Sequence, residues 1–568
     1  MSGSYGIAAV ILVALAAMLI GSQGLRVSRT TSDFYVASRT VQSRLNGAAI
    51  SGEYVSAASF LGIAGLVLVH GAGMLWYSVG YTAGFLVLLL FVAAPLRRSG
   101  AYTLPDFAEA RLEARLVRRI SSVFVVGIGW LYLVPQLQAA GLTLQTATGA
   151  PWWVGGVLVA LVVGANVAAG GMRSITFVQA FHYWLKLTAL LVPVVFLALA
   201  WHADGAPSAT AGRPVFARAT VLRAGAALRL RLPDPVQVTA DGSVDGQRYQ
   251  RAVLALTPGV HSLDPGTSLA FPAKARVPES LDAPSATTAQ WGSALVGGPG
   301  SHPLYATYGV ILATFLGAMG LPHVVVRFYT SPNGRAARRT TLVVLGLLGA
   351  FYLLPPLYGA LARVYAPDLA LTGNSDAAVL LLPERLIGGT GGMLLGALLV
   401  GGAFAAFLAT SSGLAVSLAG VLSQDVLPSV GVRSFRWATL PAIGAPLALT
   451  LGGMRLPVAD TVGLAFAVAA SSFCPLLVLG IWWRRLTPPG AVAGVLVGGG
   501  LALVAVVSTM VGAVSGGWPH ALLAWPAVWT VPAGFLVMVL VSLATPRRIP
   551  AGTAATMARL HLPEAAGR

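Results

Sequence analysis

Cysteine is almost absent from this sequence: Cys474 stands alone among 568 residues, so no disulfide framework can form within the chain. Charge is scarce as well, because Asp, Glu, Lys and Arg make up 10% of the residues, whereas a typical soluble domain carries about 25%. The Gly-Lys-Ser/Thr signature of a phosphate-binding loop is missing, which leaves ATP without an obvious binding motif. These absences exclude a disulfide-rich secreted module and a soluble enzyme, and we do not expect an enzyme at all.

What is abundant is apolar surface. Hydrophobic residues are 56% of the chain and its mean hydropathy is +0.78, which also excludes a disordered chain. A helix that spans a bilayer needs roughly 20 mostly apolar residues. The sequence therefore predicts an all-α polytopic membrane protein with 13 transmembrane helices. The expected spans are 5–24, 46–69, 74–95, 120–148, 152–170, 176–200, 303–326, 340–364, 389–424, 436–454, 458–483, 490–513 and 523–545.

The positive charge is distributed as a topology signal. The chain has 36 basic residues against 18 acidic ones, and 23 of the 36 fall in alternate loops between the expected spans. Cytoplasmic loops carry such an excess of Arg and Lys. We therefore predict an external N-terminus, a cytoplasmic C-terminus and no nucleic-acid partner. The excess of Arg over Lys, with abundant Ala and Gly, is typical of a GC-rich bacterium, so we expect the bacterial cytoplasmic membrane.

Residues 201–301 differ from the rest of the chain, because they are polar and rich in Pro and Gly. The alternation in Ala227–Leu232 predicts a strand, and Asp241-Gly242 is a hairpin signal. The predicted topology places this insert outside the cell. It forms either a small β-rich lobe or an irregular loop.

Two of the expected spans contain residues that interrupt a membrane helix. Span 46–69 includes Glu53, Tyr54, three serines and two glycines within fifteen residues, a poor composition for a helix facing lipid. Unwinding there would free backbone carbonyls for a ligand, as in transporters with broken helices; the alternative is a packing face with Glu53 paired to a neighbour. Span 303–326 has a second candidate break, or a simple kink, at Gly320 and Pro322. The two spans are five helices apart, as an inverted repeat of five plus five helices requires.

The span 389–424 contains Ala406, Thr410 and Ser411. Carbonyl and hydroxyl oxygens are the hard ligands that an alkali cation prefers. The alternative is that these hydroxyls bond back to their own helix. Asp425, near the inner end, is interpreted as a solvated boundary residue.

At these positions the chain resembles the sodium:solute symporter family, within it the branch of cation/acetate, or monocarboxylate, symporters. The likeness runs from about residue 30 to 545, and the insert is the main segment that is additional to the family pattern. The stretches that carry it are SGEYVSAASFLG at 51–62, GAYTLPD at 100–106, GLPHVVVRF at 320–328, AVAASSFCP at 467–475, and Trp482-Trp483 with LTPPG at 486–490.

The resemblance implies a leucine-transporter-like core of two inverted five-helix repeats, with one helix before it and two after. The corresponding division of the chain is 1–45 for the external N-terminal end, first helix and cytoplasmic loop, 46–200 for the first repeat, 201–301 for the insert, 302–483 for the second repeat, 484–546 for two peripheral helices and 547–568 for the cytoplasmic tail.

It also implies a sodium site built from carbonyls of the first core helix and from a carbonyl and hydroxyls of the eighth. Ala409 departs from the family pattern, because it stands where a hydroxyl is expected. Carried over residue by residue, the cation ligands are Gly47, Ile50, Ala406 and Thr410, with Ser411 as a substitute for the missing hydroxyl.

Glu53 and Lys186 are candidate coupling residues, since they are ionisable groups on helices that pack near each other in such cores. A buried lysine can supply the positive charge that sodium would otherwise bring. The alternative is a lysine that is only structurally paired. The coupling ion is therefore Na+ or H+, and no other cofactor is expected.

The resemblance implies secondary active symport of acetate or a related short monocarboxylate, such as propionate or pyruvate, into the cell. A small carboxylate suits the positive ends of half-helices at the breaks. The expected partners are this substrate, a monovalent cation and the bilayer, with no obligate protein partner. Another small solute such as an amino acid, a receptor and a channel remain alternatives. The candidate substrate ligands are Tyr54, Ser56, Tyr132, Gln136, Thr314 and Phe315.

Overall fold

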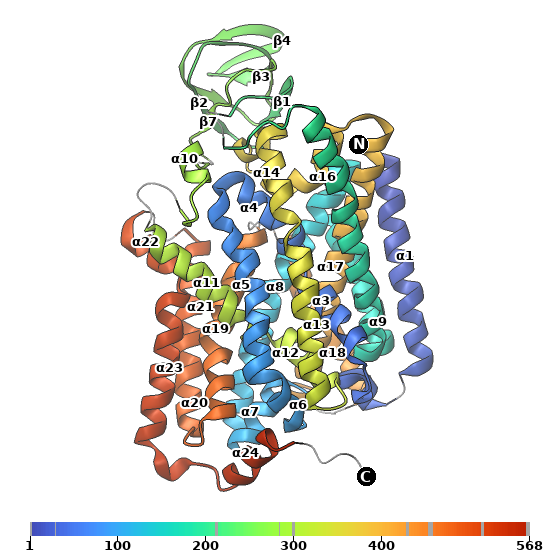
Figure 1. The fold of residues 1–568 in the computed structure, drawn as a ribbon, viewed down its shortest axis with the longest axis vertical. Helices are drawn as coiled ribbons and strands as arrows, with labels where there is room; N and C mark the ends of the chain where they lie inside the picture. The colour runs from blue at the N-terminus through green and yellow to red at the C-terminus, as the bar shows by residue number, and fades with distance from the viewer. Residues whose placement is uncertain are drawn as a thin grey trace.

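Long helices run side by side through most of the molecule, and a small sheet stands at one end of them (Figure 1). The first helix begins at the end that carries the sheet, and the last helix lies at the opposite end. This computed structural model describes residues 3–28, 30–210, 214–282, 285–297, 302–427, 431–452, 458–512 and 516–563.

Ten helical segments among the described residues are long and apolar enough to cross a membrane, or eleven if the bent pair α3 and α4 counts as one span. The helices that form them are α1 (Gly3–Val27), α3 (Ser43–Tyr54), α4 (Ile63–His70), α5 (Leu75–Val87), α6 (Ala93–Ser99), α8 (Arg115–Thr148), α9 (Trp152–Ala203), α11 (Pro303–Gly320), α12 (Pro322–Val326), α13 (Gly334–Tyr352), α14 (Pro355–Tyr365), α17 (Gly389–Asp425), α19 (Val458–Trp482), α20 (Pro488–Gly494), α21 (Gly500–Met510) and α23 (Ala527–Ala544). The other helices are α2 (Thr31–Val36), α7 (Leu104–Leu112), α10 (Thr288–Trp291), α15 (Asp368–Leu371), α16 (Ala378–Leu386), α18 (Val432–Leu451), α22 (Gly517–Ala524) and α24 (Thr553–His561).

This number is smaller than the thirteen spans expected from the sequence. The expected spans 152–170 and 176–200 both lie in α9, whose backbone breaks at Gly171 with φ +55° and ψ −149°. The expected span 436–454 corresponds to α18, which contains Arg433 and Arg436 and is not among the ten apolar segments. The chain is thus a helical polytopic membrane protein with about ten apolar helices.

The insert contains one seven-stranded sheet among its described residues, with the order β1-β6-β3-β5-β2-β7 and with β4 paired to β3. Alternate residues of β2 are buried, so its leucines face the small core of the insert and its arginines face out. Leu371 of α15 joins this core and connects the sheet to the helices. The strands are β1 (Thr220–Arg223), β2 (Leu228–Leu232), β3 (Val236–Val244), β4 (Gln247–Leu256), β5 (Gly259–Leu263), β6 (Ser268–Phe271) and β7 (Glu279–Ser280).

The hairpin of the insert turns at a different place from the one expected. β3 continues through Asp241 and Gly242, and its pairing with β4 shifts register between Ala240 and Gly242. The turn falls instead at Asp245 and Gly246, which both have positive φ. Gly242 has φ +122° and lies against Thr267, a bulge conformation that needs glycine.

An ion pair next to this turn makes the stability of the sheet depend on pH. His261 Nδ1 lies 2.7 Å from Asp245 Oδ2, and its Nε2 lies 2.9 Å from the Thr257 carbonyl oxygen. Burial alone would lower the pKa of His261, but its hydrogen bonds to Thr257 and Asp245 outweigh burial and raise that pKa above 6.5. Burial alone would raise the pKa of Asp245, but the hydrogen bonds from His261 and Ser262 outweigh it and lower that pKa below 3.8.

We therefore expect the sheet to be most stable between pH 3.8 and pH 6.5. The contribution of His261 to the stability of the sheet is complete below pH 6.5 and is lost as the pH rises through the raised pKa of His261. The aspartate contribution is complete above 3.8 and is lost as pH falls through the lowered pKa of Asp245. Hydrogen exchange of the backbone amides of β3 to β5, corrected for intrinsic rates, measures the loss of stability at both ends of this pH range. H261Q should abolish the loss of protection at higher pH, and an unchanged profile in this variant would contradict the assignment.

Candidate cation and substrate site

The first broken helix ends at Tyr54. Val55 has φ −70° and ψ 93°, and a π-helical turn at 58–62 then leads into α4 at an angle of 69° to α3. Span 46–69 is broken as expected, but Gly47 and Ile50, two of the candidate cation ligands, lie before the break and inside α3, where their carbonyls serve the helix. The break forms where side chains of other helices replace the missing helical hydrogen bonds.

The second broken helix ends at Gly320, as the sequence predicted. Leu321 is extended, with φ −71° and ψ 117°, and α12 begins at Pro322. Proline suits this first helical position because its missing N–H would have no helical partner there. A Cβ atom on Gly320 would lie 2.3 Å from the Ala469 carbonyl oxygen, so the close contact with α19 requires glycine.

Lys186 binds the carbonyls that the first break leaves free. Its ammonium donates to the carbonyl oxygen of Gly52 and, at 2.7 Å, to that of Val55. Thr410 of α17 donates from Oγ1 to the Glu53 carbonyl oxygen at 2.6 Å. Two carbonyls spaced i and i+3, with the Thr410 hydroxyl beside them, form the kind of oxygen set expected for a cation. The ammonium of Lys186 occupies that set.

A fully buried ion pair lies next to this ammonium. Arg327 Nε is 2.6 Å from Glu53 Oε2, and neither side chain is more than 1% exposed. Arg327 also donates to Thr176 Oγ1 at 3.0 Å and to the side-chain oxygen of Gln179. With Lys186 protonated, this group carries one negative and two positive charges, a net charge of +1.

The remaining candidate cation ligands of α17 are less directly involved. Gln179 Nε2 donates to the carbonyl oxygen of Ala409 at 2.9 Å. Ala409 therefore contacts the buried polar group through its backbone. Ala406 and Ser411 are buried in α17. The Ser411 hydroxyl has no hydrogen-bond partner among the described residues. The structure does not bring Ser411 to the carbonyls that Lys186 occupies.

Gln136, Ser56, Tyr132 and His323 surround the first break. Gln136 Oε1 accepts the backbone N–H of Ala57 at 2.9 Å, which caps the second half-helix, while its Nε2 has no partner among the described residues. The Ser56 hydroxyl has no hydrogen-bond partner among the described residues, and the Tyr132 ring lies 5.2 Å from that of His323. Ser56, Gln136 and His323 thus bring unused hydrogen-bonding groups close to the first break.

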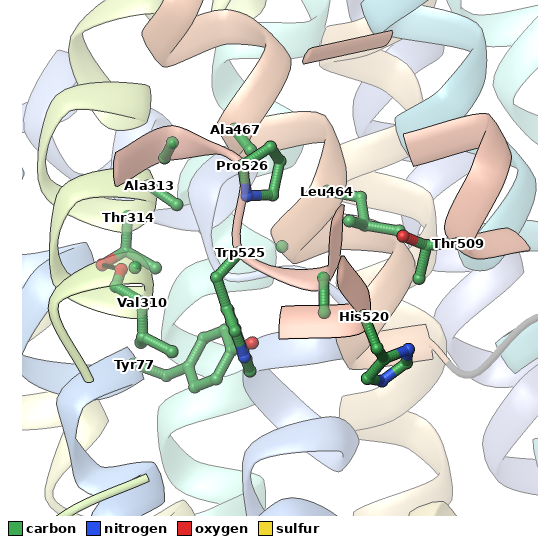
Figure 2. A pocket seen from close by; sticks show the side chains of 14 residues that line it. Tyr77, Val310, Ala313, Thr314, Leu464, Ala467, Thr509, His520, Trp525 and Pro526 are labelled. Carbon is green, nitrogen blue, oxygen red and sulfur yellow. Dashed lines mark hydrogen bonds between the residues drawn. The ribbon is translucent and has the colours of Figure 1, made fainter. Parts of the chain in front are cut away.

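The other three candidate substrate residues are placed differently. Tyr54 donates its hydroxyl to the Tyr81 carbonyl oxygen at 3.2 Å. Thr314 bonds back to Val310 at 2.7 Å and lines a cavity of about 200 Å³ (Figure 2). Phe315 is half-buried beside it on α11. Figure 2 shows Thr314 on the cavity wall, with Tyr77 and Trp525 nearby.

Sequence reasoning underestimated several residues at the site. Neither Arg327 nor His323 was among the candidate site residues, although Arg327 is buried and neither ring nitrogen of His323 has a partner among the described residues. A usable signal lay in α9, where Thr176, Gln179, Tyr183 and Lys186 recur at intervals of three and four residues. That spacing places polar groups on one face of an apolar helix.

Asp425 was predicted to be a solvated boundary residue, but the structure shows its side chain buried and paired. Its carboxylate bonds Arg118 at 2.5 Å and the Ser122 hydroxyl, and its side chain is only 6% exposed. Arg118 binds Asp106 at 2.9 Å and Glu109 at 2.7 Å as well. Asp425 therefore connects α17 to α8, and through Arg118 to α7, which lies at the end of the molecule opposite the sheet (Figure 1).

Comparison with known proteins agrees with this architecture. The sodium:solute symporter family matches residues 34–210 and 299–498. The chain is 30% identical over 497 residues to the monocarboxylic acid transporter of Corynebacterium glutamicum, covering 84% of this chain and 78% of that protein. It is 28% identical over 525 residues to an uncharacterised symporter of Bacillus subtilis, covering 90% and 88% respectively.

A solved structure shares the fold. The substrate-bound, outward-open structure of a Na+-coupled sialic acid symporter superposes with a TM-score of 0.63 at 14% identity, covering 94% of this chain and 98% of that one. This likeness supports a leucine-transporter-like arrangement of the helices. The chain belongs to the sodium:solute symporter family, which confirms the resemblance seen in its motifs. It is a solute symporter of the membrane.

Proposed function

We propose that this protein is a secondary active symporter that carries acetate or a related short monocarboxylate into the cell. The net charge of +1 around Glu53, Arg327 and Lys186 suits a monovalent anion. Buried polar groups are normally hydrogen-bonded, so the unused nitrogens of Gln136 and His323 favour a ligand with acceptor oxygens. The 30% identity to a monocarboxylic acid transporter supports the same class of substrate.

We propose further that a proton on Lys186 takes the place of the coupling sodium. The observation that carries this proposal is the contact of the Lys186 ammonium with the carbonyls of Gly52 and Val55. A protonated lysine offers three N–H donors, whereas a neutral amine offers two and presents a lone pair. Loss of the proton would therefore weaken the hold of α9 on the broken helix, and the break would be free to move.

Sodium coupling is the second candidate, because Thr410 stands beside the same carbonyls. It requires Lys186 to leave those carbonyls before sodium can bind.

One monocarboxylate moving with one proton is electroneutral, so voltage adds no driving force, whereas each additional cation would add about 2.3 kcal/mol per 100 mV. Electrically silent uptake by reconstituted vesicles is therefore expected, and a substrate-dependent inward current would contradict one-to-one coupling.

For the orientation we propose that the sheet and the start of α1 lie outside the cell and that α24 lies in the cytoplasm of a bacterial cell. The charge distribution of the loops supports this orientation. The ends of the molecule agree with it, since α24 lies opposite the sheet (Figure 1). Labelling of single cysteines placed in the insert and in α24 of a Cys474-free variant tests it.

Counterflow of labelled acetate in proteoliposomes, measured above the background of protein-free vesicles, tests the substrate class. Unlabelled propionate and pyruvate inside the vesicles should drive uptake of the label, whereas amino acids should not. Counterflow with amino acids alone would favour the alternative class of solute.

Gln136→Ala is expected to raise the apparent KM for the acid about tenfold, because it removes one hydrogen-bond donor and the cap on Ala57. The matched control is Gln138→Ala. This position is two residues further along α8, about 200° around the helix, and partly exposed. Counterflow at equal membrane levels of the two variants is the measurement. An unchanged KM in Q136A would remove Gln136 from the site.

A further inference from the structure

A second cavity, of about 530 Å³, lies where the sheet meets the membrane helices. Its wall combines the insert with Arg363, near the end of α14. No residue of the broken-helix site contributes to this wall. Most of the lining is apolar and includes Pro214, Pro233, Val277, Pro278, Leu281, Ala286 and Ala289.

Arg363 is the buried cation of this cavity. It is 6% exposed, and its Nε donates to the Ala209 carbonyl oxygen at 3.2 Å. Its guanidinium carbon lies 5.0 Å from the centre of the Trp291 ring. No carboxylate in the described part of the chain forms an ion pair with it. Nearby Arg385 shows the usual arrangement, because it is paired with Asp368.

A guanidinium has five N–H donors, and the Ala209 carbonyl uses one of them. Buried charges in proteins are normally paired, because an unpaired one loses its hydration without compensation. Arg363 therefore has unused donors and an unbalanced positive charge at the wall of a cavity.

The other charged residues of the wall do not neutralise it. Arg276 is half-exposed and is paired with Asp234 at 3.1 Å. Glu279 of β7 is exposed and forms no ion pair with Arg363 in the described structure. Arg363 is thus a buried cation of the wall that has no carboxylate partner among the described residues.

We propose that this cavity binds an organic carboxylate with an apolar body. The carboxylate pairs with the guanidinium of Arg363, whose planar fork of donors matches two carboxylate oxygens. The apolar body packs against the prolines and aliphatic side chains of the wall. A halide would use the charge but leave this apolar surface uncovered. The site is separate from the proposed transport site and goes beyond the transport function.

The occupant would lie close to the outer end of the broken helix. Trp291, stacked against Arg363, donates its indole N–H to the carbonyl oxygen of Val67 at 2.7 Å, in the last turn of α4. Ala286, also in the wall, donates its backbone N–H to the carbonyl oxygen of Val69 at 2.8 Å. The same short segment therefore contacts both the cavity and α4.

Calorimetric titration of the purified full-length protein with benzoate tests the proposal. We expect saturable binding to the wild type, and binding weaker by about 10- to 100-fold in R363Q, because charge-assisted hydrogen bonds are lost. The matched control is R231Q, an exposed arginine of β2 outside the wall, which should bind like the wild type. Chloride at the same concentrations should give no comparable heat.

A second variant keeps the test decisive if R363Q fails to fold. Ala289→Trp fills the cavity from its exposed wall without altering the guanidinium, and it should also abolish benzoate binding. Equal affinity for benzoate in wild type and A289W would overturn the proposal. Binding that survives R363Q but disappears in Q136A would overturn it too, because benzoate would then occupy the transport site. Acetate counterflow is measured separately, so failure here leaves the transport proposal intact.

Discussion

Replacing Lys186 by methionine is expected to reduce proton-driven accumulation of substrate to the level of protein-free vesicles. Methionine has similar length but no N–H donors, so the carbonyls of Gly52 and Val55 would lose their side-chain partner. Each unsatisfied buried group costs about 1–3 kcal/mol. The variant would also lack the group that carries the proton. The measurement is uptake of labelled pyruvate under an imposed pH gradient.

The chain offers an exact control for this substitution, because Lys274 is its other lysine. Lys274 is exposed in the insert, and K274M should accumulate substrate like the wild type. Both variants are compared at equal amounts of reconstituted protein. Full accumulation by K186M would show that Lys186 carries no coupling proton.

Replacing Arg327 by methionine is expected to destabilise the protein by about 3–5 kcal/mol, because it leaves the buried carboxylate of Glu53 without its ion-pair partner. The substitution also removes the donors to Thr176 and Gln179. The measurement is the midpoint of thermal unfolding of the purified protein, which should fall clearly below that of the wild type.

Arg229→Met is the matched control, since Arg229 pairs with Asp282 at 2.7 Å while 61% and 33% of the two side chains are exposed. A more exposed pair is worth about 0–1 kcal/mol, so the midpoint should change little. The double variant E53Q/R327M should lose less stability than the two single losses together, because the pair acts as a unit. Equal midpoints for R327M and R229M would contradict the importance of the buried pair.

The sequence predicted the second break more closely than the first for a local reason. Gly320 and Pro322 act on their own backbone, so the end of α11 could be predicted from those residues alone. The first break depends on side chains distant in sequence. Lys186 and Gln136 bind backbone groups on either side of it, and no local pattern in the first core helix shows that they do so.

The same difference between local signals and contacts from distant residues explains where the candidate ligands lie. Thr410 faces the first broken helix, whereas Gly47 and Ile50 lie inside α3, and the carbonyls that side chains contact are those of Gly52, Glu53 and Val55. Arg327 was not among the candidate residues, because only the folded chain shows its contact with Glu53. Charge counting gives the number of basic residues near a span end, whereas burial and pairing depend on tertiary packing.

The insert shows the limit of turn signals. The alternation that predicted a strand at Ala227–Leu232 coincides with β2, because buried leucines and exposed arginines are a direct consequence of strand geometry. The Asp241-Gly242 signal was misleading, because a bulge also uses a glycine with positive φ. The actual turn at Asp245-Gly246 has the same dipeptide, which residues 241–246 contain twice.

The most direct test of the central claim is pyruvate uptake by proteoliposomes in sodium-free buffer with an inwardly directed proton gradient. Pyruvate is preferable to acetate here, because un-ionised acetic acid crosses bilayers unaided, and protein-free vesicles provide the background. If the Lys186 ammonium takes the place of the coupling sodium, the vesicles accumulate pyruvate above that background, and added sodium does not increase the rate. Accumulation that appears only with a sodium gradient would contradict this account.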